Sequence, residues 1–133
     1  MRATARRREG MVHEVEVEGH TVLLDEPVDA GGTDTAPSPT RLLTASLAAC
    51  TAMTIRLYAE RKEWDVDGLV VDAEFGGSPR AGETARFDVA VTLPEGLTDE
   101  QRERIMVIAG KCPVHRILAA GAEVVTTERK PGD

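Results

Sequence analysis

The sequence predicts an α+β fold built as a single domain over residues 1–133. Strand-like stretches with alternating apolar residues lie on both sides of one long, alanine-rich helical stretch, and two shorter helical stretches follow. The chain has one Trp, one Tyr and two Phe, so its core must come from Val, Leu, Ile and Ala. We expect antiparallel sheets packed around a long central helix, and a core this small favours further burial in a homodimer.

Three short stretches at the amino end predict an antiparallel meander. The expected strands are residues 3–8, 11–18 and 21–25, and apolar and polar residues alternate within 11–18 as in a strand with one buried face. Glu9-Gly10 and Gly19-His20 separate these stretches and have the composition of tight turns.

The long helix is predicted over residues 38–64. Residues 26–37, rich in Gly, Pro, Asp and Thr, form an irregular loop that leads to Ser38, which can cap the helix, and to Pro39, which suits the first helical position. Apolar and small residues cover a wide arc of this helix, so we expect other elements to enclose it. Cys50 lies near its middle, in a packed interior or at an interface.

A second group of strands follows the long helix. Residues 69–75 and 85–93 alternate in the strand pattern and are separated by a Gly- and Pro-containing turn, which predicts a hairpin. Near the end of the chain, residues 122–128 predict a closing strand.

Two shorter helices are marked by their starts. Thr98 and Gln101 have the spacing of a capping box that opens a helix through about residue 109. Cys112 precedes Pro113, which predicts a fresh helix start there, with Gly121 beyond its end.

Charge and hydropathy argue against nucleic acid and membrane partners. Sixteen Lys and Arg against 23 Asp and Glu give a net charge of −7, and the basic cluster within residues 2–8 is expected to be a solvated edge. We expect no stretch long and apolar enough to span a bilayer, and no signal region after the basic start. The prediction is a cytoplasmic protein.

The two cysteines have different settings, and the difference bears on their chemistry. Cys112 lies at a helix amino end, where free N–H groups stabilise a thiolate. Cys50 is surrounded by apolar neighbours, so it needs a cation or hydrogen-bond donor to become reactive. Arg41 and Arg56 are poorly placed on its helix, whereas a cation from residues 6–8 or from a second subunit remains open.

The residues alone leave two other interpretations of the cysteines open. Both can be buried thiols that act as small hydrophobes. A zinc site made by Cys50, Cys112 and His115 is weaker, because the sequence offers only three plausible ligands and no paired CxxC. Ser38, Ser46 and Thr51 lack a base and acid in motif context, which makes hydroxyl nucleophiles improbable.

Three segments together resemble the OsmC/Ohr family of osmotically inducible protein C and organic hydroperoxide resistance proteins. They are the approach to the long helix at residues 36–39, its segment 42–50 ending in Cys50, and residues 111–115 around Cys112-Pro113. The resemblance covers nearly the whole chain. It implies an OsmC-like α+β fold in which two subunits interlock, with the long helices buried at the centre.

The resemblance also implies a thiol peroxidase of oxidative stress defence that uses no cofactor and no metal. Cys50 would attack an organic hydroperoxide and become a sulfenic acid, and Cys112 would resolve it as a Cys50–Cys112 disulfide. A dithiol reductant would then return both thiols.

One departure separates this sequence from the hydroperoxide-resistance branch. That branch has a Glu that orients an activating Arg, whereas Thr40 stands at the matching position here and residues 26–35 contain no Arg. The alternative function is therefore a non-catalytic OsmC-like dimer that binds a small apolar ligand or a metal at its interface.

Overall fold

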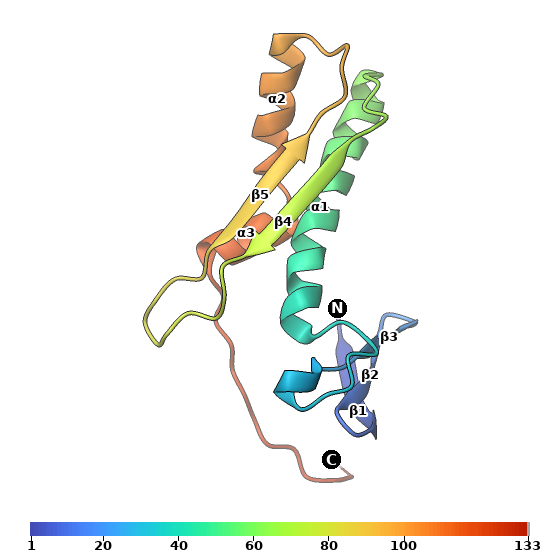
Figure 1. Cartoon of the computed structure of the whole chain (residues 1–133), viewed down its shortest axis with the longest axis vertical. Helices are drawn as coiled ribbons and strands as arrows, with labels where there is room; N and C mark the ends of the chain where they lie inside the picture. Colours follow the sequence, from blue (N-terminus) through green and yellow to red (C-terminus); the bar gives the residue numbers. More distant parts are fainter. Residues whose placement is uncertain (133) are drawn as a thin grey trace. The chain divides into compact units, whose positions relative to one another are not determined.

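The computed structural model describes residues 1–132 and divides the chain into two compact units (Figure 1). Unit 1 comprises Met1–Ala48 and Ala73–Val89, and unit 2 comprises Ala49–Asp72 and the chain from Ala90 onward. The long helix α1 runs from one unit into the other. In chain order the elements are β1 (Ala3–Glu9), β2 (Val12–Val17), β3 (His20–Leu24), the 3-10 turn η1 (Val28–Ala30), α1 (Pro39–Lys62), β4 (Val70–Phe75), β5 (Phe87–Thr92), α2 (Asp99–Ala109) and α3 (Pro113–Ala120).

The amino-terminal meander is confirmed. Strands β1, β2 and β3 form an antiparallel sheet in that order, with Ala5 opposite Val15 and Val15 opposite Val22. The register shifts between Arg7 and Glu9, at the turn into β2. Apolar residues share a register position across the sheet, as the period of two requires.

The loop between β3 and α1 is organised around the Asp25 carboxylate, whose residue is only 2% exposed. The carboxylate accepts hydrogen bonds from the Glu26 N–H (2.8 Å), from the N–H and hydroxyl of Thr33 (3.1 and 2.7 Å), and from the N–H and hydroxyl of Thr35 (3.1 and 2.9 Å). A Cβ at Gly32 would overlap the Glu26 carbonyl, so only glycine lets the chain pass this close. The loop is thus irregular, as predicted, but closely hydrogen-bonded.

Helix α1 begins and ends as predicted. The Arg41 N–H donates to Ser38 Oγ at 3.3 Å, which is the expected cap, and Arg61 and Lys62 occupy the last turn.

Within the described chain, other elements cover only one face of α1, and burial of the remaining surface by a partner subunit stays a prediction. The buried stripe is narrow, with Leu47, Thr51, Ile55 and Ala59 spaced four residues apart. Large side chains outside this stripe are exposed, including Met53 at 70% and Leu57 at 52%. One chain of this length has too few elements to cover the whole helix, so only one face is buried.

Helix α1 also corrects the expectation about membrane-spanning stretches. It contains an 18-residue window of mean hydropathy 1.4, long and apolar enough for a span by length and composition alone. The core helix of a water-soluble fold passes the same test, and Ile55 and Ala59 of α1 belong to such a core in unit 2. The helix therefore does not point to a membrane protein.

The core of unit 2 joins helices and strands. Its buried members are Ile55, Ala59, Val66, Ile105 and Ala109, with Trp64, Leu69, Val91, Leu93 and Leu97 packed against them. Helix α2 starts at the predicted capping box: Thr98 Oγ accepts the Gln101 N–H at 3.1 Å, and Gln101 Oε1 accepts the Thr98 N–H at 2.8 Å. Helices packed on strands confirm the α+β prediction.

Strands β4 and β5 form the predicted hairpin, visible as the yellow and green arrows of Figure 1. Burial alternates residue by residue in both strands, which matches the sequence pattern. At the unit 1 end, Phe75 and Phe87 stack with ring centroids 4.9 Å apart.

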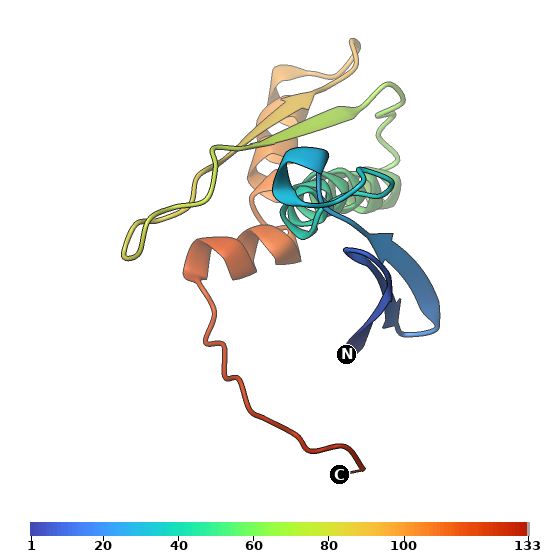
Figure 2. The same ribbon diagram turned by 60° about the horizontal axis from the view of Figure 1, so that its bottom comes forward.

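The closing strand predicted over residues 122–128 is absent. This segment follows α3 as an extended trace that is not assigned to a strand (Figures 1 and 2), and Val124 and Val125 are 84% and 75% exposed. A strand is stabilised by pairing with a neighbour, and the described chain supplies none at this place.

Candidate dithiol site

The structure brings Cys50 and Cys112 together in unit 2. Both are free thiols, and their side chains lie close enough to influence each other's pKa. Cys112 is fully buried at 0% exposure, whereas Cys50 is half-buried. The pair therefore has one sulfur that faces the surface and one that is enclosed.

The first turn of α3 positions Cys112. Cys112 is the N-cap residue, and its Sγ accepts the His115 N–H at 3.4 Å, while its carbonyl accepts the Arg116 N–H at 3.0 Å. Pro113 occupies the first helical position, where its missing N–H costs nothing. The Cys-Pro start thus aims the unpaired amides of the helix at a sulfur.

The surroundings of Cys112 stabilise its thiolate. Burial is the largest single influence and raises the pKa of Cys112, but hydrogen bonds from Cys50, the His115 N–H, the Thr51 hydroxyl and the Val114 N–H together outweigh it. The pKa of Cys112 is therefore lowered from its ordinary value. Nearly all of this effect comes from neutral donors.

The surroundings of Cys50 act in the opposite direction. Burial raises the pKa of Cys50 most, and the hydrogen bond and charge of Cys112 raise it further. The Val114 N–H and the Thr54 hydroxyl lower it, but by less. In the reduced pair, Cys50 is thus the thiol that keeps its proton.

Thr51 is the functional residue that sequence reasoning missed. From the sequence it stands only as an improbable nucleophile, whereas in the structure its hydroxyl interacts with Cys112. It is 2% exposed and lies four residues from both Leu47 and Ile55 on the buried stripe of α1. That spacing was the available signal, since a polar residue on a buried stripe needs a partner.

The cation expected to activate Cys50 is not found within unit 2. Arg56 extends instead to Asp67, with 3.3 Å between Nη1 and Oδ1, and no cation is among the groups that shift the pKa of Cys50 there. In unit 1, Arg41 pairs with Asp34 at 3.1 Å and Arg6 pairs with Glu16 at 3.1 Å. Both of these arginines have local acidic partners.

The part of the chain that the structure describes offers no set of ligands for the zinc alternative. Across residues 1–132, no three His, Cys, Asp or Glu side chains lie close enough together to hold a metal ion. His115 contributes its backbone N–H to Cys112, and its own side chain is exposed.

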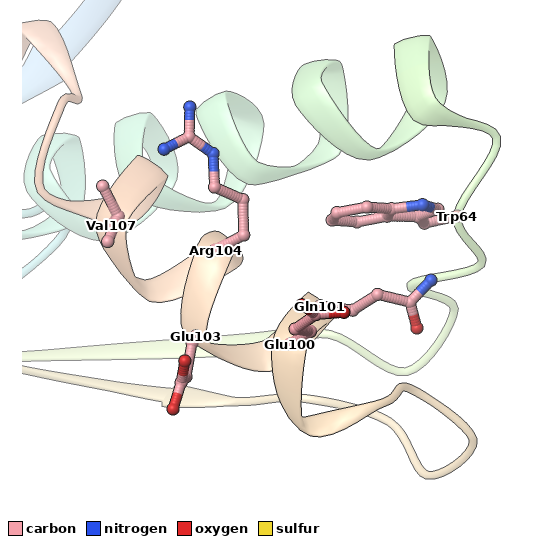
Figure 3. A pocket seen from close by; sticks show the side chains of 6 residues that line it. All are labelled: Trp64, Glu100, Gln101, Glu103, Arg104 and Val107. Carbon is pink, nitrogen blue, oxygen red and sulfur yellow. The ribbon is translucent and has the colours of Figure 1, made fainter.

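A separate surface hollow of about 450 Å³ lies between the end of α1 and α2, and neither cysteine lines it (Figure 3). Figure 3 shows Trp64 and Gln101 side by side, with Arg104 extending from α2 toward α1. Arg104 Nε donates to the Tyr58 hydroxyl at 3.2 Å. The hollow is lined by Trp64, Glu100, Gln101, Glu103, Arg104 and Val107.

Solved structures of other proteins share this fold. An OsmC-like protein from Mycoplasma pneumoniae matches with a TM-score of 0.74 and 22% identity, over 89% of this chain and 86% of that one. The organic hydroperoxide resistance protein OsmC from Legionella pneumophila matches with a TM-score of 0.64 and 23% identity, over 89% of both chains. An organic hydroperoxide resistance protein from Elizabethkingia anophelis, crystallised with thiocyanate bound, matches with a TM-score of 0.60 and 24% identity, over 86% and 84%.

Comparison with protein families gives the assignment. No curated protein matches the sequence. The family model described as OsmC-like protein matches residues 32–127, which include the long helix and both cysteines. The chain belongs to the OsmC-like protein family.

Proposed function

We propose that this protein is a thiol-dependent peroxidase that reduces organic hydroperoxides in oxidative stress defence. Membership of the OsmC-like family, together with structural neighbours named organic hydroperoxide resistance proteins, supports a peroxide-related role. The observation that carries the proposal is the contact between the half-buried Cys50 thiol and the buried Cys112 thiol.

The proposed reaction uses both sulfurs. The Cys50 thiolate attacks the distal oxygen of the hydroperoxide, which breaks the O–O bond and yields a Cys50 sulfenic acid and an alkoxide, which takes up a proton and leaves as the alcohol. The Cys112 thiolate then attacks the Cys50 sulfur and displaces hydroxide, leaving a Cys50–Cys112 disulfide and, after protonation, water. A dithiol reductant of the cytoplasm returns both cysteines to thiols.

Apolar surface within unit 2 supports an organic substrate and a homodimer. Exposed large side chains on α1, α2 and α3 include Met53 at 70%, Leu57 at 52% and Ile117 at 59%. Exposed large apolar side chains, where they gather on one face, mark an interaction site. A second copy that covers part of α1 would enclose the pair in apolar surroundings, and sedimentation as a monomer would contradict this part of the proposal.

The alternative is a non-catalytic dimer that binds a small apolar ligand or a metal at its interface. The raised pKa of Cys50 favours it, since a peroxidatic cysteine must ionise to react. Metal analysis and thiol titration separate the two functions: a reactive thiolate without bound metal supports the peroxidase, and ordinary thiol behaviour of both cysteines supports the binding protein.

The test is the intact mass of the reduced protein after one equivalent of cumene hydroperoxide, followed by mapping of any new cross-link. We expect the loss of two hydrogens and a peptide pair joined through Cys50 and Cys112. An unchanged mass with two free thiols would reject the peroxidase.

A further inference from the structure

The proposed reaction leaves the activation of Cys50 unexplained. Thr40 stands where the related branch has a Glu, and Arg56 in unit 2 is engaged with Asp67. Besides burial, the groups that act most on the pKa of Cys50 are Cys112, the Val114 N–H and the Thr54 hydroxyl. Of these, only Cys112 can accept a proton at neutral pH.

We propose that Cys112 is the internal base of the pair: the reduced protein holds one proton between the two sulfurs, with the thiolate at Cys112, and Cys112 accepts the proton of Cys50 as Cys50 attacks. This inference rests on the proposed peroxidase function. It adds a role to Cys112 that precedes disulfide formation.

The geometry supports Cys112 as the resting thiolate. Its Sγ is at the amino end of α3, 3.4 Å from the His115 N–H, and it also interacts with the Val114 N–H and the Thr51 hydroxyl. The backbone and the buried stripe of α1 hold these donors in place, so the donors need not reorganise when Cys112 becomes a thiolate. The Cys50 thiol completes the set by hydrogen-bonding to the same sulfur.

Exposure assigns the two roles. Cys112 is fully buried, so its thiolate cannot meet a hydroperoxide directly, whereas the half-buried Cys50 can. The negative charge therefore rests on the enclosed Cys112 sulfur. The Cys50 sulfur, which substrate can reach, becomes the nucleophile when it passes its proton to Cys112. This arrangement also protects the thiolate from unselective oxidation.

The step balances in atoms and protons. The Cys50 S–H bond breaks and its proton passes to Cys112, while the Cys50 sulfur takes the distal oxygen and the O–O bond breaks to release an alkoxide. The Cys112 thiol then gives that proton to the alkoxide, which leaves as the alcohol. Cys112 is again a thiolate and is ready to attack the sulfenic acid.

Charged neighbours do not replace this arrangement in unit 2. Lys111, His115 and Arg116 surround Cys112 in the sequence, and all three side chains are exposed. The groups that act on Cys112 are Cys50, the Thr51 hydroxyl and two backbone amides. The pH dependence of the pair should therefore follow the two sulfurs themselves.

Titration of thiolate ultraviolet absorbance in the full-length reduced protein tests the resting state. We expect one thiolate to form below the ordinary thiol pKa of about 8.5. It should disappear in Cys112→Ser and persist in Cys50→Ser. Serine is a good N-cap, so Cys112→Ser should keep the start of α3. Loss of the low-pH thiolate in Cys50→Ser alone, or no such thiolate in the unsubstituted protein, would overturn the proposal.

Single-turnover oxidation of Cys50 by cumene hydroperoxide tests the base. At pH 7, sulfenic acid trapping in Cys112→Ser should be at least about tenfold slower than Cys50 oxidation in the unsubstituted protein, because the base is lost. The rate in this variant should rise only when Cys50 ionises by itself. An unchanged rate would mean that Cys112 acts only as the resolving cysteine and not as the base. Absence of Cys50 oxidation in the unsubstituted protein would instead reject the peroxidase, and the titration would still locate the resting proton.

Discussion

At both Asp25 in unit 1 and Cys112 in unit 2, the ionised form of a buried acidic group is stabilised, but the donors that stabilise it differ. Each is a buried acidic group, at 2% and 0% exposure. Each has its pKa lowered chiefly by neutral donors, which are N–H and O–H groups at Asp25 and the Cys50 thiol, N–H groups and one hydroxyl at Cys112. In each case two threonine or cysteine side chains work together with backbone amides.

The difference lies in whether the donating groups can lose their protons. The Asp25 carboxylate is surrounded by Thr33, Thr35 and Glu26, and none of their donating groups ionises near neutral pH. One donor to Cys112 is the Cys50 thiol, whose S–H proton is titratable. Hydrogen-bond donors alone thus make a structural anion, whereas a titratable donor makes a pair that can move a proton.

The largest expected effect is at the titratable donor. Cys50→Ser should abolish hydroperoxide turnover, because serine keeps a hydrogen bond to Cys112 but supplies no sulfur for oxidation. Consumption of cumene hydroperoxide with excess dithiothreitol measures this. Cys112→Ser is the matched contrast, since it should still form a slow sulfenic acid at Cys50 without recycling through the disulfide. Full turnover in both variants would contradict the proposed mechanism.

At the structural anion, substitution should change stability and its pH dependence. The pKa of Asp25 is lowered chiefly by the Thr33 hydroxyl, so the folded state binds fewer protons than the unfolded state in acid. Its stabilising effect is present above the unfolded pKa of about 3.9 and is lost as the pH falls below it. Asp25→Asn should lower the melting temperature at pH 7 by at least about 5 °C.

The same variant should have a flatter dependence of stability on pH below about 4, because the titrating group is gone. Thermal unfolding followed by circular dichroism at several pH values measures both effects. Asp29→Asn, in the exposed turn η1, is the control and should behave like the unsubstituted protein. Equal acid sensitivity in Asp25→Asn would show that other carboxyl groups dominate.

A smaller stability loss should follow from crowding the carboxylate loop. In Gly32→Ala the new Cβ would overlap the Glu26 carbonyl and lie 2.7 Å from Asp25 Oδ1, so the backbone must shift. We expect a cost of about 1–3 kcal/mol in the free energy of unfolding, measured by urea titration. Gly110→Ala is the control, because its nearest contact to a Cβ is an ordinary 3.6 Å. Equal stability of the two variants would contradict the close packing of this loop.

The smallest effect is expected at a donor that does not titrate. Thr51→Val removes one hydroxyl from Cys112 and should raise the pKa of the Cys112 thiol, slowing Cys50 oxidation at pH 6 about fivefold. The thiolate titration should shift in parallel, which a merely structural role would not require. Thr44→Val is the control on the same helix, since the Thr44 hydroxyl donates to the Thr40 carbonyl at 2.9 Å.

Local sequence signals predicted most of the fold because each depends on near neighbours. Ser38 and Thr98 cap their helices as expected, and the alternation in β4 and β5 matches their burial. The prediction of a closing strand over residues 122–128 was wrong because a strand depends on more than its near neighbours in the sequence. Its alternation is a strand pattern, but a strand also needs a neighbour, and the sequence does not show whether one is present.

The sequence by itself determined that two cysteines are presented by helices, one at mid-helix and one at a helix amino end, because helix starts and spacing are local properties. Only the tertiary structure decided that the two thiols touch, that Thr51 joins them and that the enclosed sulfur carries the more acidic thiol. Acidity depends on which donors surround a sulfur and how much water reaches it. These are set by packing between α1 and α3, segments about 60 residues apart along the chain, and not by the neighbours of either cysteine in sequence.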